Sequence, residues 1–248
     1  MMVRTLVVGD VHGCLLELEE LLARASYRKG EDRLVLLGDL MDRGPHPVEC
    51  VRLARELDAE CILGNHEEKH LRWRRHQERE AAEPGYKNPM SPLGEPRATE
   101  NARLDDADVA WLRALPVCLD LGGGWVAVHG GFEPARSLGE QREDRVLRMR
   151  WVDRRGRYLP LKKGSLDRPE GACHWAELWE GPLSVVYGHA VHSLSEPRVD
   201  RSASGMSCWG LDTGCCFGGH LTALELPSLR VHRVPARARY ADLAHDVE

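Results

Sequence analysis

Three short apolar runs near the start of the chain each end in glycine, and polar side chains suited to binding metal follow at once. These segments are GDVHG from Gly9, GDLMDRG from Gly38 and GNHE from Gly64. Residues with helical spacing of apolar side chains come after the first two, and a charged helix is predicted after the third. Strands alternating with helices predict βαβ units, in which ligands bind beyond the carboxyl ends of the strands. We therefore expect the three polar clusters to meet in one crevice.

The pattern of apolar runs and turns predicts the remaining elements. Strands are expected at Thr5–Val8, Arg33–Leu37, Cys61–Leu63, Val117–Leu121, Trp125–Val128, Ser184–Tyr187, Gly205–Leu211 and Leu221–Leu226, and helices from Leu15 and over Pro47–Leu57, Glu67–Ala82 and Asp105–Leu115. Three glycines between two of the strands indicate a hairpin. The fold expected is α/β: a four-layer αββα sandwich of two mixed sheets with helices outside, forming a single domain over residues 1–248.

Residues 83–100 interrupt this pattern. The segment EPGYKNPMSPLGEPRATE has four prolines, two glycines and no apolar periodicity. A loop of this length in a compact domain usually has a function, so we interpret it as a proline-rich insert or lid. Tyr86, Lys87 and Arg97 offer an aromatic ring and two cations for a base and for phosphates remote from the reacting one. The alternative is a mobile surface connector.

Composition excludes several classes of protein. A formal net charge of −5 argues against a general nucleic-acid binder, so no stable nucleic-acid complex is expected. The chain lacks an apolar run of about 18 residues, which predicts no membrane partner. Eight cysteines, mostly scattered and without a secretory signal, indicate reduced thiols and a cytoplasmic protein.

Two later apolar strands also end in histidine and glycine, as VAVHGG from Val126 and VVYGH from Val185. Together the strand ends supply Asp10, His12, Asp39, Asn65, His129 and His189. Carboxylate and amide oxygens mixed with imidazoles suit Mn²⁺, Fe or Zn²⁺ better than a calcium cage or a thiolate site. One aspartate after a strand is commonly a helix cap or turn residue. Five strand ends that each deliver a ligand type favour a metal centre.

The segments GDVHG, GDLMDRG, GNHE, VHGG and YGH, in this order, resemble the calcineurin-like metallophosphoesterases, specifically the phosphoprotein phosphatase branch. The resemblance runs from Val7 to about Leu226. A further block, LDTGCCFGG from Leu211, is similar to the closing motif of the bacterial members. These include the symmetrical diadenosine tetraphosphatases and small bacterial phosphatases. The resemblance implies the metallophosphoesterase fold and an enzyme that hydrolyses phosphate esters or anhydrides.

The same resemblance implies a metal-binding role for each matched ligand. Asp10 and His12 would bind a first ion, and Asp39 would bridge both ions. The second ion would be completed by Asn65, His129 and His189. A hydroxide held between the two ions would attack phosphorus in line. Two divalent ions are expected, with Mn²⁺ preferred and Fe, Zn²⁺, Co²⁺ or Ni²⁺ as alternatives.

The resemblance also implies catalytic and phosphate-binding residues. His66, paired with Asp42, would be the general acid that protonates the leaving oxygen. Arg43 would bind phosphate oxygens through its forked guanidinium group. Arg150 is the expected second phosphate ligand, with Arg148 as the competing choice.

The phosphorylated substrate stays open between two classes. A broad phosphatase for phosphoprotein-type and aryl phosphates, with nucleoside polyphosphates as a further class, is favoured because Asp42 and Glu67 stand where the symmetrical tetraphosphatases have alanine and aspartate. The alternative is a dinucleoside polyphosphate (Ap4A) hydrolase or nucleotide-cap hydrolase, supported by LDTGCCFGG. A non-catalytic scaffold is a third hypothesis, and the complete set of ligands argues against it.

Overall fold

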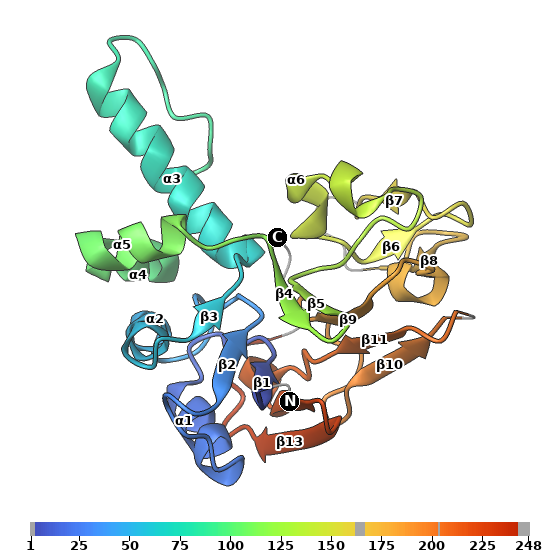
Figure 1. Cartoon of the computed structure of the whole chain (residues 1–248). Coiled ribbons are helices and arrows are strands. Elements are labelled where there is room, and N and C mark those ends of the chain that lie inside the picture. Colours follow the sequence, from blue (N-terminus) through green and yellow to red (C-terminus); the bar gives the residue numbers. More distant parts are fainter. Residues whose placement is uncertain (1–2, 162–166, 203, 243–248) are drawn as a thin grey trace.

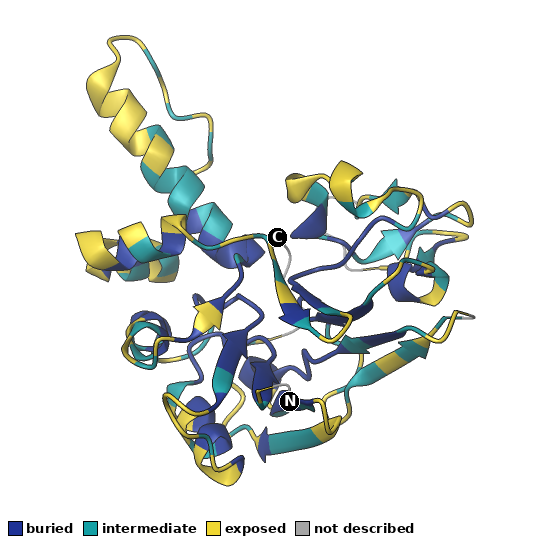
Figure 2. Ribbon diagram, viewed as in Figure 1, coloured by how far each residue is buried: buried dark blue, intermediate teal, exposed yellow. Residues whose placement is uncertain are grey.

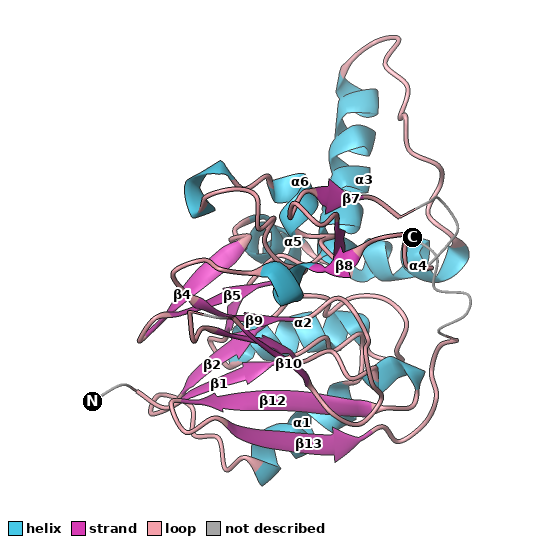
Figure 3. Cartoon of the chain, turned by 90° about the vertical axis from the view of Figure 1, so that its right-hand side faces the viewer, coloured by secondary structure: helices cyan, strands magenta, loops and turns pink. Residues whose placement is uncertain are grey.

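Two five-stranded sheets lie face to face at the centre of the structure (Figures 1 and 3). The computed structural model describes residues 3–161, 167–202 and 204–242, so both ends of the expected 1–248 domain lie outside the described residues. The first sheet has the order β13 (Arg230–Pro235), β12 (His220–Leu226), β1 (Thr5–Val8), β2 (Arg33–Leu36), β3 (Glu60–Cys61). The second has the order β10 (Arg198–Arg201), β11 (Ser207–Gly210), β9 (Ser184–Tyr187), β5 (Trp125–Val128), β4 (Cys118–Gly122).

Strand direction brings the polar segments to one edge of the sandwich. In the first sheet β1, β2 and β3 are parallel, whereas β12 is antiparallel to β1. In the second sheet β5, β9 and β11 are parallel, and β4 and β10 flank them in the antiparallel direction. Both sheets are therefore mixed, which confirms the predicted fold class.

Alternating side chains of each strand fill two different cores. Leu6 and Val8 of β1 pack on the helices outside the first sheet, whereas Val7 points between the sheets. In the second sheet Ala127 and Val186 meet Val7 in this inner core. This period of two is the expected signature of a strand that is covered on both faces.

Helices and a small sheet cover the two outer faces. The helices are α1 (Leu15–Arg24), α2 (Pro47–Glu56), α3 (Asn65–Ala82), α4 (Glu95–Arg103), α5 (Asp106–Arg113) and α6 (Glu143–Val146), with single 3₁₀ turns η1 (Leu138–Glu140), η2 (Trp175–Leu178) and η3 (Cys215–Phe217). α1 and α2 pack against the first sheet (Figure 1). Residues of α6, η2 and a sheet of β7 (Tyr158–Leu159), β6 (Trp151–Val152) and β8 (Cys173–His174) pack against the second. Among the described residues, no helix is both long and apolar enough to cross a membrane.

Residues 83–100 were expected to form a loop throughout, and this expectation is wrong for the last part of the segment. Its last part begins α4 at Glu95, with Pro96 in the first turn, where a missing N–H costs nothing. The inward face of α4 carries Arg97, Glu100 and Asn101, which explains why no apolar periodicity announces the helix. Beside it, α3 projects from the body, and its outer half is exposed (Figure 2).

Candidate metal and phosphate site

The loops after the strands hold the predicted site residues in a strained backbone conformation. Five of these residues have positive φ angles between 44° and 71°, namely His12, Asp39, Asp42, Arg43 and His189. For a residue other than glycine, such a conformation costs about 1–3 kcal/mol and persists only where the surroundings enforce it. Strain of this kind gathers at functional sites, so its concentration here favours a functional role for the loops.

The carboxylate of Glu67 holds the loop that follows β2. Its Oε2 accepts hydrogen bonds from the backbone N–H of Asp39 at 2.8 Å and Gly64 at 3.1 Å. Its Oε1 accepts from the N–H of Leu40 at 2.8 Å and Met41 at 2.9 Å. Glu67 is fully buried, and burial with the charge of Asp39 raises its pKa. We did not predict this anchor, although an acid in the first turn of a helix is a capping signal.

Replacing Glu67 with glutamine should lower the free energy of unfolding by about 1–3 kcal/mol, because the amide NH₂ would face backbone N–H groups and leave some without an acceptor. Urea denaturation measures this change. Glu78→Gln on the same helix is the control, since its ion pair with Arg113 is exposed and worth little. Equal stability of the two variants would contradict the anchoring role.

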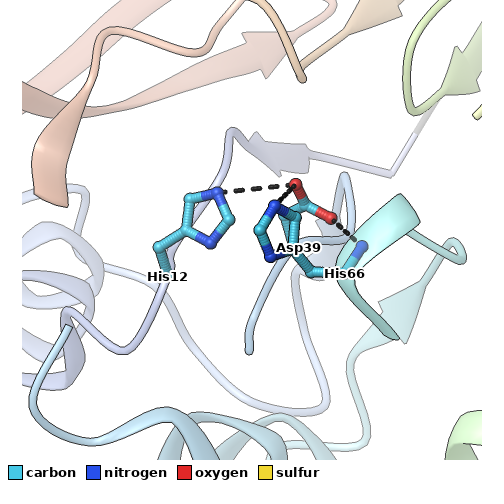
Figure 4. A group of neighbouring side chains, drawn as sticks. All are labelled: His12, Asp39 and His66. Atoms are coloured by element: carbon cyan, nitrogen blue, oxygen red, sulfur yellow. Dashed lines mark hydrogen bonds and ion pairs between the residues drawn. The ribbon is translucent and has the colours of Figure 1, made fainter. Parts of the chain in front are cut away.

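The first group of ligand types lies between β1 and β2. His12 Nε2 is 3.4 Å from Asp39 Oδ2 and 4.0 Å from Asp10 Oδ2. The other ring nitrogen, Nδ1, donates to the carbonyl of Met41 at 2.8 Å, which leaves Nε2 as an acceptor. Figure 4 shows the ring of His12 directed at the Asp39 carboxylate. Asp10 lies against Gly188, where a Cβ atom would approach Asp10 Oδ1 to 2.0 Å.

The second group faces the other oxygen of Asp39. His129 Nδ1 donates to the carbonyl of Leu37 at 2.7 Å, and Nε2 lies 2.8 Å from Asn65 Oδ1 and 3.4 Å from Asp39 Oδ1. The ring of His189 is 5.1 Å from that of His129, and both group with Asp39 as candidate ligands. Asp39 thus directs Oδ2 to the first group and Oδ1 to the second, as a bridging carboxylate would.

Charge in this site is buried and balanced among neighbours. Burial opposes the ionised form of Asp39, but the charges of His129, His66 and His12 and the hydrogen bond with His129 together outweigh it and hold the pKa of Asp39 well below its usual range. Conversely, burial lowers the pKa of His129, but Asp39 raises it to about 10. Burial and the charge of Asp212 raise the pKa of Asp10 well above its usual range. Buried carboxylates that share protons with imidazoles fit divalent ions, which would replace those protons.

His66 and Asp42 lie beside the ligand groups and contact each other. His66 Nδ1 forms a short hydrogen bond with Asp42 Oδ2, and His66 Nε2 is 3.8 Å from Asp39 Oδ2. His70 Nε2 donates to Asp42 Oδ1 at 2.8 Å. Burial acts to raise the pKa of Asp42, but the hydrogen bonds from His66 and His70 hold it well below its usual range. The arrangement keeps an ionised carboxylate behind the imidazole.

Two arginines approach the same centre. Arg43 contacts His12 Nε2, donates to His66 Nε2 at 3.0 Å and lies 5.2 Å above the ring of Phe217. Arg150 donates to His189 Nε2 at 3.0 Å, whereas Arg148 pairs with Glu68 at 2.8 Å. The structure therefore places Arg150, and not Arg148, at the site. A cavity of about 190 Å³ adjoins both, lined by Arg43, Arg150, Trp151, His174, His189, Ala190, Val191, His192, Asp212 and Phe217.

Comparisons with known proteins agree with this geometry. Residues 3–223 match the family model for calcineurin-like phosphoesterases. The symmetrical bis(5'-nucleosyl)-tetraphosphatase of Chromohalobacter salexigens is 29% identical, over 94% of this chain and 98% of the relative. The asymmetrical bis(5'-nucleosyl)-tetraphosphatase PrpE of Halalkalibacterium halodurans is 30% identical, over 93% of each chain. A crystal structure described as that of a candidate diadenosine tetraphosphatase superposes with a TM-score of 0.76 at 28% identity, over 95% of each chain.

The family model covers most of the chain and includes the six residues that are expected to bind metal. The family is one of metal-dependent phosphohydrolases, and the ligand types that the structure gathers are those that divalent ions require. The chain belongs to the calcineurin-like phosphoesterase family and is a metal-dependent hydrolase of phosphate compounds.

Proposed function

We propose that this hydrolase cleaves a phosphate anhydride in dinucleoside polyphosphates. The observation that carries the proposal is the cavity beside the ligand groups, which joins two guanidinium groups to the rings of Trp151, His192 and Phe217. A dinucleoside polyphosphate carries several charges along its phosphate chain and ends in flat bases, which suit the guanidinium groups and the rings of this cavity. The names of the similar tetraphosphatases support the same substrate class.

Two divalent ions, with Mn²⁺ preferred, would be held by Asp10, His12, Asp39, Asn65, His129 and His189. When bound, they would neutralise phosphate oxygens and activate the attacking water. Asp39 shares its two oxygens between the two groups of ligands, which keeps both groups at a fixed spacing. His12 and His129 are each locked by a carbonyl acceptor in the tautomer that offers Nε2.

The remaining residues would bind the substrate and supply a proton. Arg43 and Arg150 present forked donors to phosphate oxygens, and their present partners are imidazole nitrogens at the same centre. His66 Nδ1 is engaged by Asp42, so Nε2 would be the atom that gives a proton to the leaving oxygen, once Arg43, which donates to Nε2 here, binds phosphate instead. Asp42 holds the imidazole in orientation and stabilises its charged form.

One observation favours a second candidate, a broad phosphomonoesterase. The His66–Asp42 pair is most useful when the leaving group is a strong base, such as the alkoxide of phosphoserine. A nucleotide phosphate leaves as a weaker base and needs less protonation. This pair therefore supports activity on phosphoprotein-type phosphates at the same centre.

Initial rates on Ap4A, ATP, a phosphopeptide and an aryl phosphate separate the two candidates. We expect kcat/KM for Ap4A to exceed that for the aryl phosphate about tenfold or more, since each added charged hydrogen bond is worth about 1.5–3 kcal/mol. Arg150→Lys should lower that preference because lysine cannot bind in a fork. Arg148→Lys is the control.

A preference for the phosphopeptide would instead establish the phosphomonoesterase. Product analysis adds a further result: two ADP molecules indicate symmetrical cleavage, and ATP with AMP indicates asymmetrical cleavage. Both kinds of relative are about equally similar to this chain.

A further inference from the structure

Asp42 is contacted by α4, a helix that lies outside the strand-end motifs. Arg97, in the first half of α4, donates through Nε to Asp42 Oδ2 at 2.5 Å. That same oxygen accepts the hydrogen bond from His66 Nδ1. Asp42 is 3% exposed, so Arg97 supplies a countercharge to a carboxylate that water barely reaches. The proline-rich segment therefore directly contacts the His66–Asp42 pair, which is called the acid pair below.

A second route leads from α4 to the same carboxylate. Asn101 donates through Nδ2 to His70 Nδ1 at 3.0 Å, and Arg74 fixes the orientation of the amide by donating to its Oδ1 at 2.9 Å. Since His70 Nδ1 accepts, its proton resides on Nε2, which donates to Asp42 Oδ1 at 2.8 Å. Both oxygens of Asp42 are thus oriented by α4, one by Arg97 and the other by Asn101 through His70.

The electrostatics of α4 are matched to this contact. Glu100 lies one turn beyond Arg97, and burial together with the negative charge of Asp42 raises the pKa of Glu100 to about 8. Near neutral pH Glu100 is therefore mostly uncharged and does not compete with Asp42 for the guanidinium group. Glu100 is half-buried, whereas Asn101, His70 and Asp42 are buried.

The other candidate contacts of the segment turn away from the site. The hydroxyl of Tyr86 forms a hydrogen bond with His76 Nδ1 at 2.5 Å. The guanidinium group of Arg79 lies 4.1 Å from the centre of the Tyr86 ring, so Tyr86 packs along α3. Lys87 is exposed. The expected set of three substrate contacts is thus reduced to Arg97, and Arg97 contacts Asp42.

We propose that Arg97 is a positioning residue for the acid pair, and that α4 makes the proline-rich segment part of the proton-donating machinery. This inference rests on the role of His66 in the proposed function. Arg97 and His66 share one oxygen of Asp42, so Arg97 fixes the rotation of that carboxylate. The carboxylate in turn directs the His66 ring, with Nε2 toward the leaving oxygen.

The test compares Arg97→Ala, Arg97→Lys and the control Arg103→Ala in the metal-loaded enzyme. Arg103 lies in the last turn of α4, and its side chain pairs with Glu49 at the surface. Loss of an outer partner that orients a metal ligand typically costs about 10–100-fold, and we expect a similar cost for a residue that orients a proton donor. We expect Arg97→Ala to lower kcat by that amount on an alkyl phosphate with little change in KM, and much less on an activated aryl phosphate. Arg97→Lys should recover part of the loss.

A double-mutant cycle with His66→Asn distinguishes positioning from a general loss of structure. If Arg97 acts through His66, Arg97→Ala should add almost nothing to the loss in His66→Asn. Additive losses, equal losses on both substrates, or a rise in KM at constant kcat would each overturn the inference. If His66→Asn itself shows no dependence on the leaving group, the acid assignment in the proposed function fails and this inference fails with it. If His66→Asn shows a leaving-group effect and Arg97→Ala does not, only the role of Arg97 is rejected.

Discussion

Turnover of an unactivated phosphoester should fall about 10²–10⁴-fold when His66 is replaced with asparagine, the usual contribution of a general acid. The loss should shrink for an activated aryl phosphate, whose leaving group departs without a proton. Asparagine keeps the backbone N–H that donates to Asp39 Oδ1 at 3.1 Å, so the metal ligands should stay in place. Steady-state rates on the two substrates measure the difference.

Metal analysis of His66→Asn tests whether His66 is a metal ligand and not a general acid. His66 Nε2 lies 3.8 Å from Asp39 Oδ2, and His66 groups with His12 and Asp39 as a candidate ligand set. A ligand would take an ion with it when removed, whereas an acid would not. His76→Asn is the matched control, because His76 lies on the same helix and contacts Tyr86. Loss of an ion, or an equal loss of rate on both substrates, would reject the acid.

Asp39→Asn should abolish most activity on every substrate. The amide has the same shape but loses the charge and one of the two acceptor oxygens that face His12 and His129, each at 3.4 Å. Loss of an outer partner of a metal ligand costs roughly 10–100-fold, so loss of a direct and shared ligand should exceed that range. The effect should be the same for good and poor leaving groups, in contrast to His66→Asn.

Asp32→Asn provides the comparison for this change. Asp32 precedes β2 and pairs with Arg4 at 2.9 Å, whereas Asp39 follows the same strand at its other end. Asp32→Asn should leave kcat/KM unchanged even where it lowers stability. An Asp39→Asn enzyme with nearly full activity would contradict the bridging role.

Local sequence patterns predicted the central sheets because their strands are covered on both faces. Val7 and Val186 belong to short apolar runs bounded by glycine, and such runs are distinctive. β13 was missed because its two valines, Val231 and Val234, stand three residues apart and so lack the alternation of a strand. The strands β6 to β8 have two residues each, too few for any periodicity to appear.

The sequence likewise predicted one part of the candidate site and missed another part. Asp10, Asp39 and His129 follow predicted strands directly, so their convergence was foreseeable from topology. The residues that hold the site in place could not be predicted, because their role depends on contacts between distant segments. Arg97 and Asn101 belong to a helix whose inner face is polar, and polar helical residues usually face solvent. Only the packing of α4 against the acid pair distinguishes them from surface residues.

The number of divalent ions in the active enzyme decides whether the hydrolase works with a two-metal centre. We would remove metal from the protein, titrate Mn²⁺ back, and record bound ions per chain by elemental analysis alongside the rate on Ap4A. Asp39 faces both ligand groups, so we expect two ions per chain at full activity and fewer in Asp39→Asn. Full activity with one ion per chain, or with none, would contradict this expectation.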